Sequence, residues 1–234
     1  MTRRLFLSAL ALLATGCSSV QPALRDRTNA LLGDYRSRAP GLVPAPATAG
    51  PRAWEPGQYV VYAVTREGKP GLLRYAVEER TAEGVWLGIQ ELSYETKSLW
   101  RVLLKRDLTS AEDAVSQARR AIVQPDGQAT RIYDFEADSS PVVAKMRESM
   151  APLWAGFLPA QSSGSPSAVN VTAGRFEGAT EAKAALHVLG VVSEFRGHRH
   201  DAVPLTGLLD GKTSDGKATI ELLEYGDDAA SPLF

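Results

Sequence analysis

Residues 58–65 read QYVVYAVT, and after the turn sequence GKPG at 68–71 the chain continues with LLRYAVEE at 72–79. Both runs consist largely of valine, tyrosine and other residues that favour strands, and the glycine and proline between them favour a turn. Two similar runs follow at 85–94 and 98–108, so that strands recur about every dozen residues. This part of the chain therefore predicts an antiparallel meander.

The rest of the sequence predicts more strands and one well-defined helix. Ser140 and Pro141 indicate a helix start, because serine caps free N–H groups and proline suits the first helical position. Apolar residues then recur at helical spacing, which predicts a helix over 142–154. Further strands are expected at 119–124, 128–135, 169–171, 175–179, 183–195, 202–209 and 218–225, with a Ser/Gly/Pro loop at 161–168. The predicted fold is mainly β (α+β): a bent antiparallel sheet or half-barrel of about nine strands with one packed helix.

Several predicted strands are apolar on both faces. Along 59–64, for example, tyrosine, valine and alanine occupy every position, whereas a sheet with one solvated face alternates apolar and polar residues. Something must therefore cover the second face. One interpretation is that the helix at 142–154 and the loops cover it; the other is a concave apolar cavity that accepts an acyl chain. The residues expected to line such a cavity are Trp86, Trp100, Met146 and Met150.

The N-terminal residues indicate export and lipidation. Arg3 and Arg4 precede an apolar run at 5–13, which is too short to anchor a protein by crossing a bilayer and is typical of a signal peptide. Cys17, the single cysteine of the chain, follows small residues. This arrangement resembles the bacterial lipoprotein signal, in which residues 1–16 would be removed and Cys17 would be lipidated. An ordinary signal peptide that contains a cysteine is the alternative.

By the same resemblance, Ser18 favours the outer membrane, since lipoproteins kept at the inner membrane typically carry aspartate there. Residues 17–53 are expected to form a flexible tether rich in proline and alanine, with a short amphipathic helix at 24–37. A flexible segment of that length spans roughly 30 to 36 Å, which would hold the folded part away from the membrane. Residues 54–234 are expected to form a single β-rich periplasmic domain.

Four short segments carry a resemblance to a known group of proteins. They are WEPGQYVVY at 54–62, AGRFE at 173–177, AVPLTGL at 202–208 and LLEYG at 222–226. Together they resemble uncharacterised bacterial envelope lipoproteins with an open β-barrel like that of the LolA/LolB carriers. The resemblance implies an envelope location and a half-barrel whose concave face holds acyl chains under helices.

The chemistry-bearing residues favour binding over catalysis. His198 and His200 would share one face of a strand, but zinc needs three or four ligands, and His187 lies before an intervening strand. Glu78 and Glu91 have no evident partner and are expected to be solvated. The formal net charge is −1, and nothing in the sequence resembles a basic stripe for binding nucleic acid.

These observations predict a non-enzymatic outer-membrane lipoprotein that is held to the membrane by its N-terminal lipid. It would bind an apolar ligand such as an acyl chain, or a partner protein of the envelope, with no cofactor and no metal. A structural or assembly accessory with a fully packed core is an alternative. A hydrolase that uses His198 and His200 is a further one.

Overall fold

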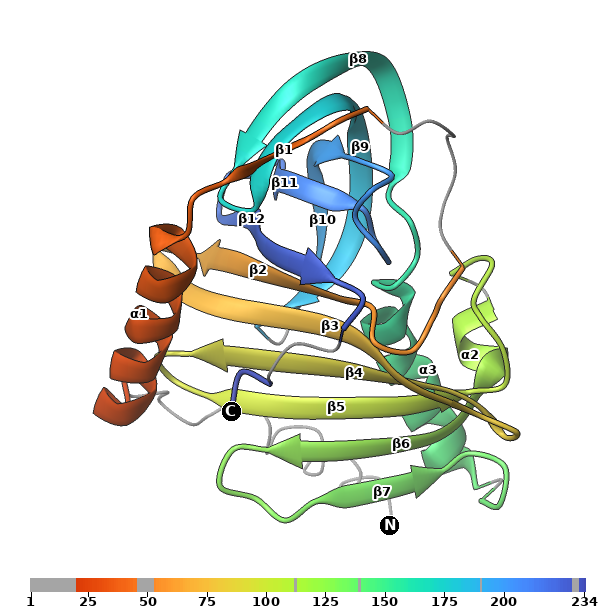
Figure 1. Ribbon diagram of the computed structural model, residues 1–234. Helices are drawn as coiled ribbons and strands as arrows, with labels where there is room; N and C mark the ends of the chain where they lie inside the picture. Colours follow the sequence, from red (N-terminus) through yellow and green to blue (C-terminus); the bar gives the residue numbers. More distant parts are fainter. Residues whose placement is uncertain (1–19, 46–52, 112, 139, 190, 229–231) are drawn as a thin grey trace.

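The computed structural model describes residues 20–45, 53–111, 113–138, 140–189, 191–228 and 232–234. Within them the chain forms three helices and a twelve-stranded sheet (Figure 1). The helices are α1 (Pro22–Ser37), α2 (Asp113–Gln117) and α3 (Pro141–Ala155). The strands are β1 (Gly41–Val43), β2 (Tyr59–Arg66), β3 (Lys69–Thr81), β4 (Gly84–Ser93), β5 (Lys97–Leu104), β6 (Ala118–Pro125), β7 (Arg131–Asp134), β8 (Gln161–Val171), β9 (Gly174–Val188), β10 (Val191–Arg199), β11 (Leu208–Lys212) and β12 (Ala218–Gly226).

The sheet is open and follows the order β1-β9-β10-β11-β12-β2-β3-β4-β5-β6-β7, with β8 paired to β9 off this path. All pairs are antiparallel except β1 with β9. This confirms the predicted fold class and the meander, which runs from β2 to β7. The strand β1 was not expected, and two further strands have other bounds than expected. The expected loop at 161–168 is part of β8, and the expected strand at 183–195 divides at Leu189, where φ is 47°.

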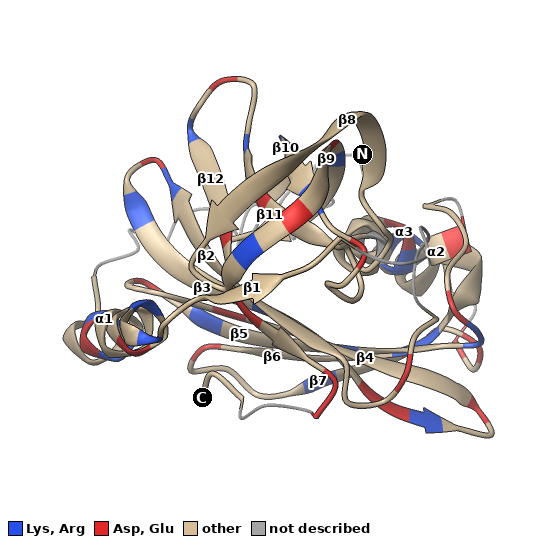
Figure 2. Cartoon of the chain, turned by 45° about the horizontal axis from the view of Figure 1, so that its top comes forward, with Lys and Arg blue, Asp and Glu red and all other residues tan. Residues whose placement is uncertain are grey.

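The antiparallel pairing places the hairpin turns at two opposite ends of the sheet. One end, called end A below, carries the turns at 67–68, 94–96, 126–130 and 213–217. The other, end B, carries the turn at 82–83 and the β5–β6 connection that contains α2. Figures 1 and 2 both show α1 on the side of end A, and α2 and α3 on the opposite side.

One face of the sheet packs against α3, which begins as the sequence predicts. The Val143 N–H donates to the Ser140 hydroxyl over 3.3 Å, and Pro141 occupies the first turn. The core under this helix includes the fully buried side chains of Tyr75, Trp154 and Phe157. We call this the first core.

The opposite face packs against α1, and this corrects the expectation of a tether over 17–53. Leu24, Leu32 and Tyr35 of α1 are at most 8% exposed and form a second core with the outward side chains of β2 to β4, including Val61 and Leu72. The strand β1 then pairs with β9. Residues 22–43 therefore belong to the folded domain, because the second apolar face of the sheet needed a cover and the apolar side of α1 supplies it. The predicted signal peptide, Cys17 and residues 46–52 lie outside the described residues.

Candidate functional site

The four side chains predicted to line a cavity do not all lie on the same side of the sheet. Trp100 pairs with Ile89 across β4 and β5 and packs on the first core, as do Met146 and Met150 of α3. Trp86 pairs with Leu103 and therefore points from the other face, because neighbouring positions along a strand alternate. On that face, the Arg101 guanidinium lies 5.0 Å from the centroid of the Trp86 ring. The prediction of a common lining is thus wrong for Trp86.

Aromatic side chains occupy the space between α3 and the sheet. The Trp154 indole N–H donates to the Ala114 carbonyl over 2.9 Å, which joins α3 to α2. The Phe157 ring meets the Tyr75 ring edge-on at 4.8 Å between centroids, and it meets the Trp54 ring at 5.9 Å. Burial raises the pKa of Tyr75 well above its usual value, and nearby Glu91 raises it further. This geometry favours the interpretation in which side chains fill the interior.

A pocket lies elsewhere, on the surface beside β9 and β10. It encloses about 580 Å³ and is half open to solvent. We call it the β9 groove. Its lining comes from four separate segments and comprises Thr109, Ser110, Ala111, Leu158, Pro159, Gln161, Lys183, Ala184, Ala185 and Glu194. Ala184 is buried and Leu158 half-buried, whereas Lys183 and Glu194 are exposed. The groove therefore combines an apolar surface with charges of both signs at its border.

A buried carboxylate and imidazole form a second cluster, which the sequence did not reveal. Glu91 is 4% exposed, and its Oε1 lies 3.0 Å from Nδ1 of His187. The same oxygen accepts the Leu189 N–H over 3.0 Å, and Oε2 accepts the Ser98 hydroxyl over 3.2 Å. The Trp100 ring meets the His187 ring edge-on. The expectation that Glu91 is solvated is therefore wrong. The three contacts of Glu91, together with the ring contact between Trp100 and His187, join the tip of the β9–β10 hairpin to β4 and β5.

The histidines proposed for a hydrolase bind separate partners. Nδ1 of His198 lies 2.8 Å from Oδ1 of Asp210, and this pair is about one-third exposed. His200 is 2% exposed, and its Nε2 lies 2.9 Å from the Glu177 carbonyl oxygen. The two rings therefore do not converge on a common point. Among the described residues, no group of three or more His, Cys, Asp or Glu side chains is arranged to hold a metal ion.

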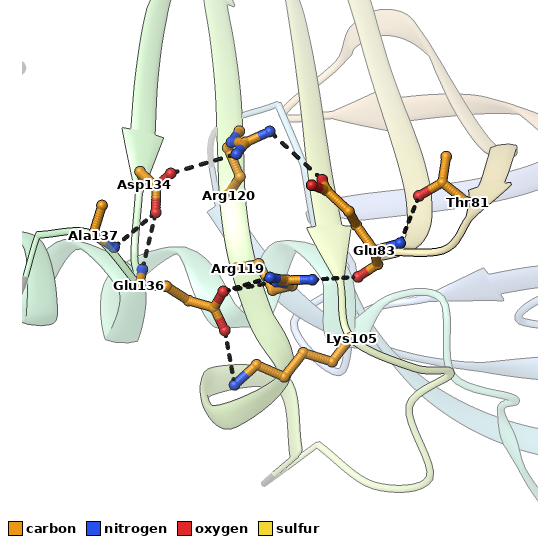
Figure 3. A network of polar contacts seen from close by, with 8 residues as sticks. All are labelled: Thr81, Glu83, Lys105, Arg119, Arg120, Asp134, Glu136 and Ala137. Atoms are coloured by element: carbon orange, nitrogen blue, oxygen red, sulfur yellow. Dashed lines mark hydrogen bonds and ion pairs between the residues drawn. The ribbon is translucent and has the colours of Figure 1, made fainter.

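A larger polar network lies at end B (Figure 3). Glu136 binds Arg119 at 2.8 Å and Lys105 at 3.1 Å, and these hydrogen bonds, the one from Lys105 first, lower the pKa of Glu136. Arg120 lies 3.5 Å from Asp134 and 4.0 Å from Glu83. Every carboxylate here faces a cation, and exposed pairs of this kind contribute little individually. The network fastens β6 to β7 and to the β3–β4 turn, which is a structural role.

Comparisons with known proteins add little to this geometry. No protein-family model matches the chain, and no curated protein matches it. The hypothetical protein CT021 from Chlamydia trachomatis is similar in structure at a TM-score of 0.37 and 12% identity, over 76% of this chain and 90% of that one. MucB, solved in complex with MucA(peri), is similar at a TM-score of 0.29 and 15% identity, over 91% of this chain and 58% of that one. At these scores neither likeness carries an argument about function. No helix among the described residues is long and apolar enough to span a membrane.

Proposed function

We propose that this protein is a non-enzymatic, lipid-anchored protein of the bacterial envelope that binds a partner protein in the β9 groove. The groove is the observation that carries this proposal. An apolar centre bordered by polar and charged side chains is the usual composition of a protein–protein interface. Leu158 and Ala184 supply the apolar centre, and Lys183 and Glu194 lie on its border.

The alternatives receive less support from the same structure. A carrier of acyl chains needs an empty apolar interior, whereas Trp154 and Phe157 are packed into the space under α3. A hydrolase needs groups that meet at one reacting atom, whereas His198 and His200 hold different partners. A purely structural role would leave the β9 groove without an occupant. The crosslinking experiment below distinguishes this alternative from partner binding.

The anchoring part of the proposal rests on residues 1–18. Arg3, Arg4, the apolar run at 5–13 and Cys17 support removal of a signal peptide and acylation of Cys17, and Ser18 supports the outer membrane. Two or more acyl chains hold a protein on a membrane almost permanently. We therefore expect the wild-type protein in the membrane pellet, and a Cys17→Ser variant in the soluble periplasmic fraction without the added lipid mass.

A photo-crosslinking amino acid at Ala185 tests the partner proposal in living cells. Ala144, an exposed alanine on α3, is the matched control position. We expect one discrete protein adduct at Ala185 that is absent at Ala144. Because Glu194 borders the groove and is exposed, the substitution Glu194→Lys should weaken the adduct and leave the fold intact. Equal adduct patterns at Ala185 and Ala144, or none at either, would refute partner binding in the groove.

A further inference from the structure

The residue that precedes α1 is fixed to end A of the sheet. The backbone N–H of Gln21 donates to the Tyr94 carbonyl over 2.8 Å. Its side-chain amide donates to the Glu95 carbonyl over 3.0 Å and to the Asp126 carboxylate over 3.1 Å. About two helical turns further along α1, the side-chain oxygen of Asn29 accepts a hydrogen bond from the Tyr94 hydroxyl over 2.6 Å. Gln21 is therefore held by two turns, 94–96 and 126–130.

Only a short stretch of chain separates this fixed point from the proposed anchor. Gln21 lies four residues after Cys17. Four residues reach at most about 14 Å when fully extended. A flexible tether over 17–53, in contrast, would allow a separation of roughly 30 to 36 Å. Because α1 is docked on the sheet, the longer distance is not available to the domain.

We propose that end A is the surface of the domain that lies against the lipid bilayer. This inference rests on the proposed acylation of Cys17. The acylated cysteine lies at the boundary of the hydrocarbon core, and each headgroup layer is roughly 5 to 7 Å thick. A reach of at most about 14 Å therefore keeps Gln21, and with it the turns at 94–96 and 126–130, at the headgroups or within about 9 Å of them.

The charges at end A indicate that the anchor, rather than electrostatic attraction, sets this orientation. Lys69 pairs with Glu95 at 2.6 Å, and Lys217 lies 3.8 Å from Asp215. Both signs are interspersed over the molecule, as Figure 2 shows. A basic surface would be drawn to anionic lipid in a salt-dependent way. The mixed charge of end A predicts instead an orientation that is insensitive to salt.

This orientation directs part of the groove's border away from the membrane. The strand β4 contains ten residues between the two ends, which corresponds to about 33 Å. Thr109 and Ser110 of the β9 groove lie in the connection at end B. A partner would therefore approach the groove from the aqueous periplasm rather than from the bilayer.

Two exposed alanines give a matched test in the full acylated chain. Ala129 lies in the β6–β7 turn of end A, and Ala82 lies in the β3–β4 turn of end B. Because acylation occupies the sulfur of Cys17, an Ala129→Cys or Ala82→Cys variant carries one free thiol for a fluorescent label. The labelled proteins are reconstituted in vesicles of phosphatidylethanolamine and phosphatidylglycerol that contain a lipid with a quencher on its headgroup. We expect loss of most fluorescence at Ala129 and its retention at Ala82, at low and at high salt.

Inserting a long Gly/Ser segment between Ser19 and Val20 provides the second arm. It should restore the fluorescence at Ala129, because it replaces the short link with a flexible tether. Equal quenching at Ala129 and Ala82, or no effect of the insertion, would overturn the inference while leaving acylation intact. An unmodified mass for Cys17, with no vesicle binding, would instead show that the proposed anchoring is wrong and remove the basis of the inference.

Discussion

If α1 belongs to the folded domain, shortening one of its buried side chains should destabilise the whole protein. Leu32 is 6% exposed and lies in the second core between α1 and the sheet. The substitution Leu32→Ala removes apolar atoms from this contact without changing the propensity for helix, since leucine and alanine both favour it. Leu42 is 68% exposed, so that Leu42→Ala is a matched control outside the core.

The expected magnitude follows from burial. Truncating a buried leucine to alanine lowers the free energy of unfolding by about 2 to 5 kcal/mol, depending on how far the surroundings relax into the space. Because α1 lies at the outside of the molecule and is free to shift inwards, we expect a value at the lower end, about 2 to 3 kcal/mol. An exposed position such as Leu42 should change the free energy by no more than about 0.5 kcal/mol.

Urea unfolding of a soluble Cys17→Ser background measures both variants. A loss of about 2 kcal/mol corresponds to a lowering of the midpoint by about 1 M urea. Fluorescence and far-ultraviolet circular dichroism should give coincident transitions, because the helix and sheet share a core. If Leu32→Ala lowers the midpoint no more than Leu42→Ala, then α1 does not contribute to the folded unit, and the argument for a short link to the membrane fails as well.

Three further predictions follow from the buried polar and aromatic groups. Glu91→Ala should lower the free energy of unfolding in urea by about 3 kcal/mol, because the His187 imidazole and the half-buried Leu189 N–H lose their acceptor. The exposed Glu79→Ala should change it by almost nothing. Burial first, and Glu224 second, raise the pKa of Tyr35 to about 12. The folded state then binds more protons than the unfolded state above about pH 10, so stability should fall from pH 10 to 12, and Tyr35→Phe should reduce that fall. Native mass spectrometry of the Cys17→Ser protein should show the mass of the chain alone; co-purified fatty acid or phospholipid would favour a carrier instead.

The sequence predicts those parts of the fold that local signals specify. The meander and the start of α3 follow from strand propensity, turn residues and the cap at Ser140. The strand β8 does not follow from local signals, because its serines and glycine favour a loop. Only pairing with β9 makes this segment a strand. In the same way, the contact between Glu91 and His187 joins residues 96 positions apart. Such a contact depends on the register of several strands, which no local pattern reveals.

Where local signals do not specify the fold, the two apolar faces of the meander are the most informative feature of the sequence. They require two covers, but the sequence provides one obvious helix. The second cover had to come from a segment of weaker amphipathic character, and 24–37 is that segment, although the proline-rich residues after it favour a tether. The docked position of α1 accounts for both the second cover and the proline-rich stretch. Because the proline-rich stretch lies after α1, it does not separate Cys17 from the folded domain. If Cys17 is acylated as proposed, the packing of a sheet face determines how far the domain can lie from the membrane.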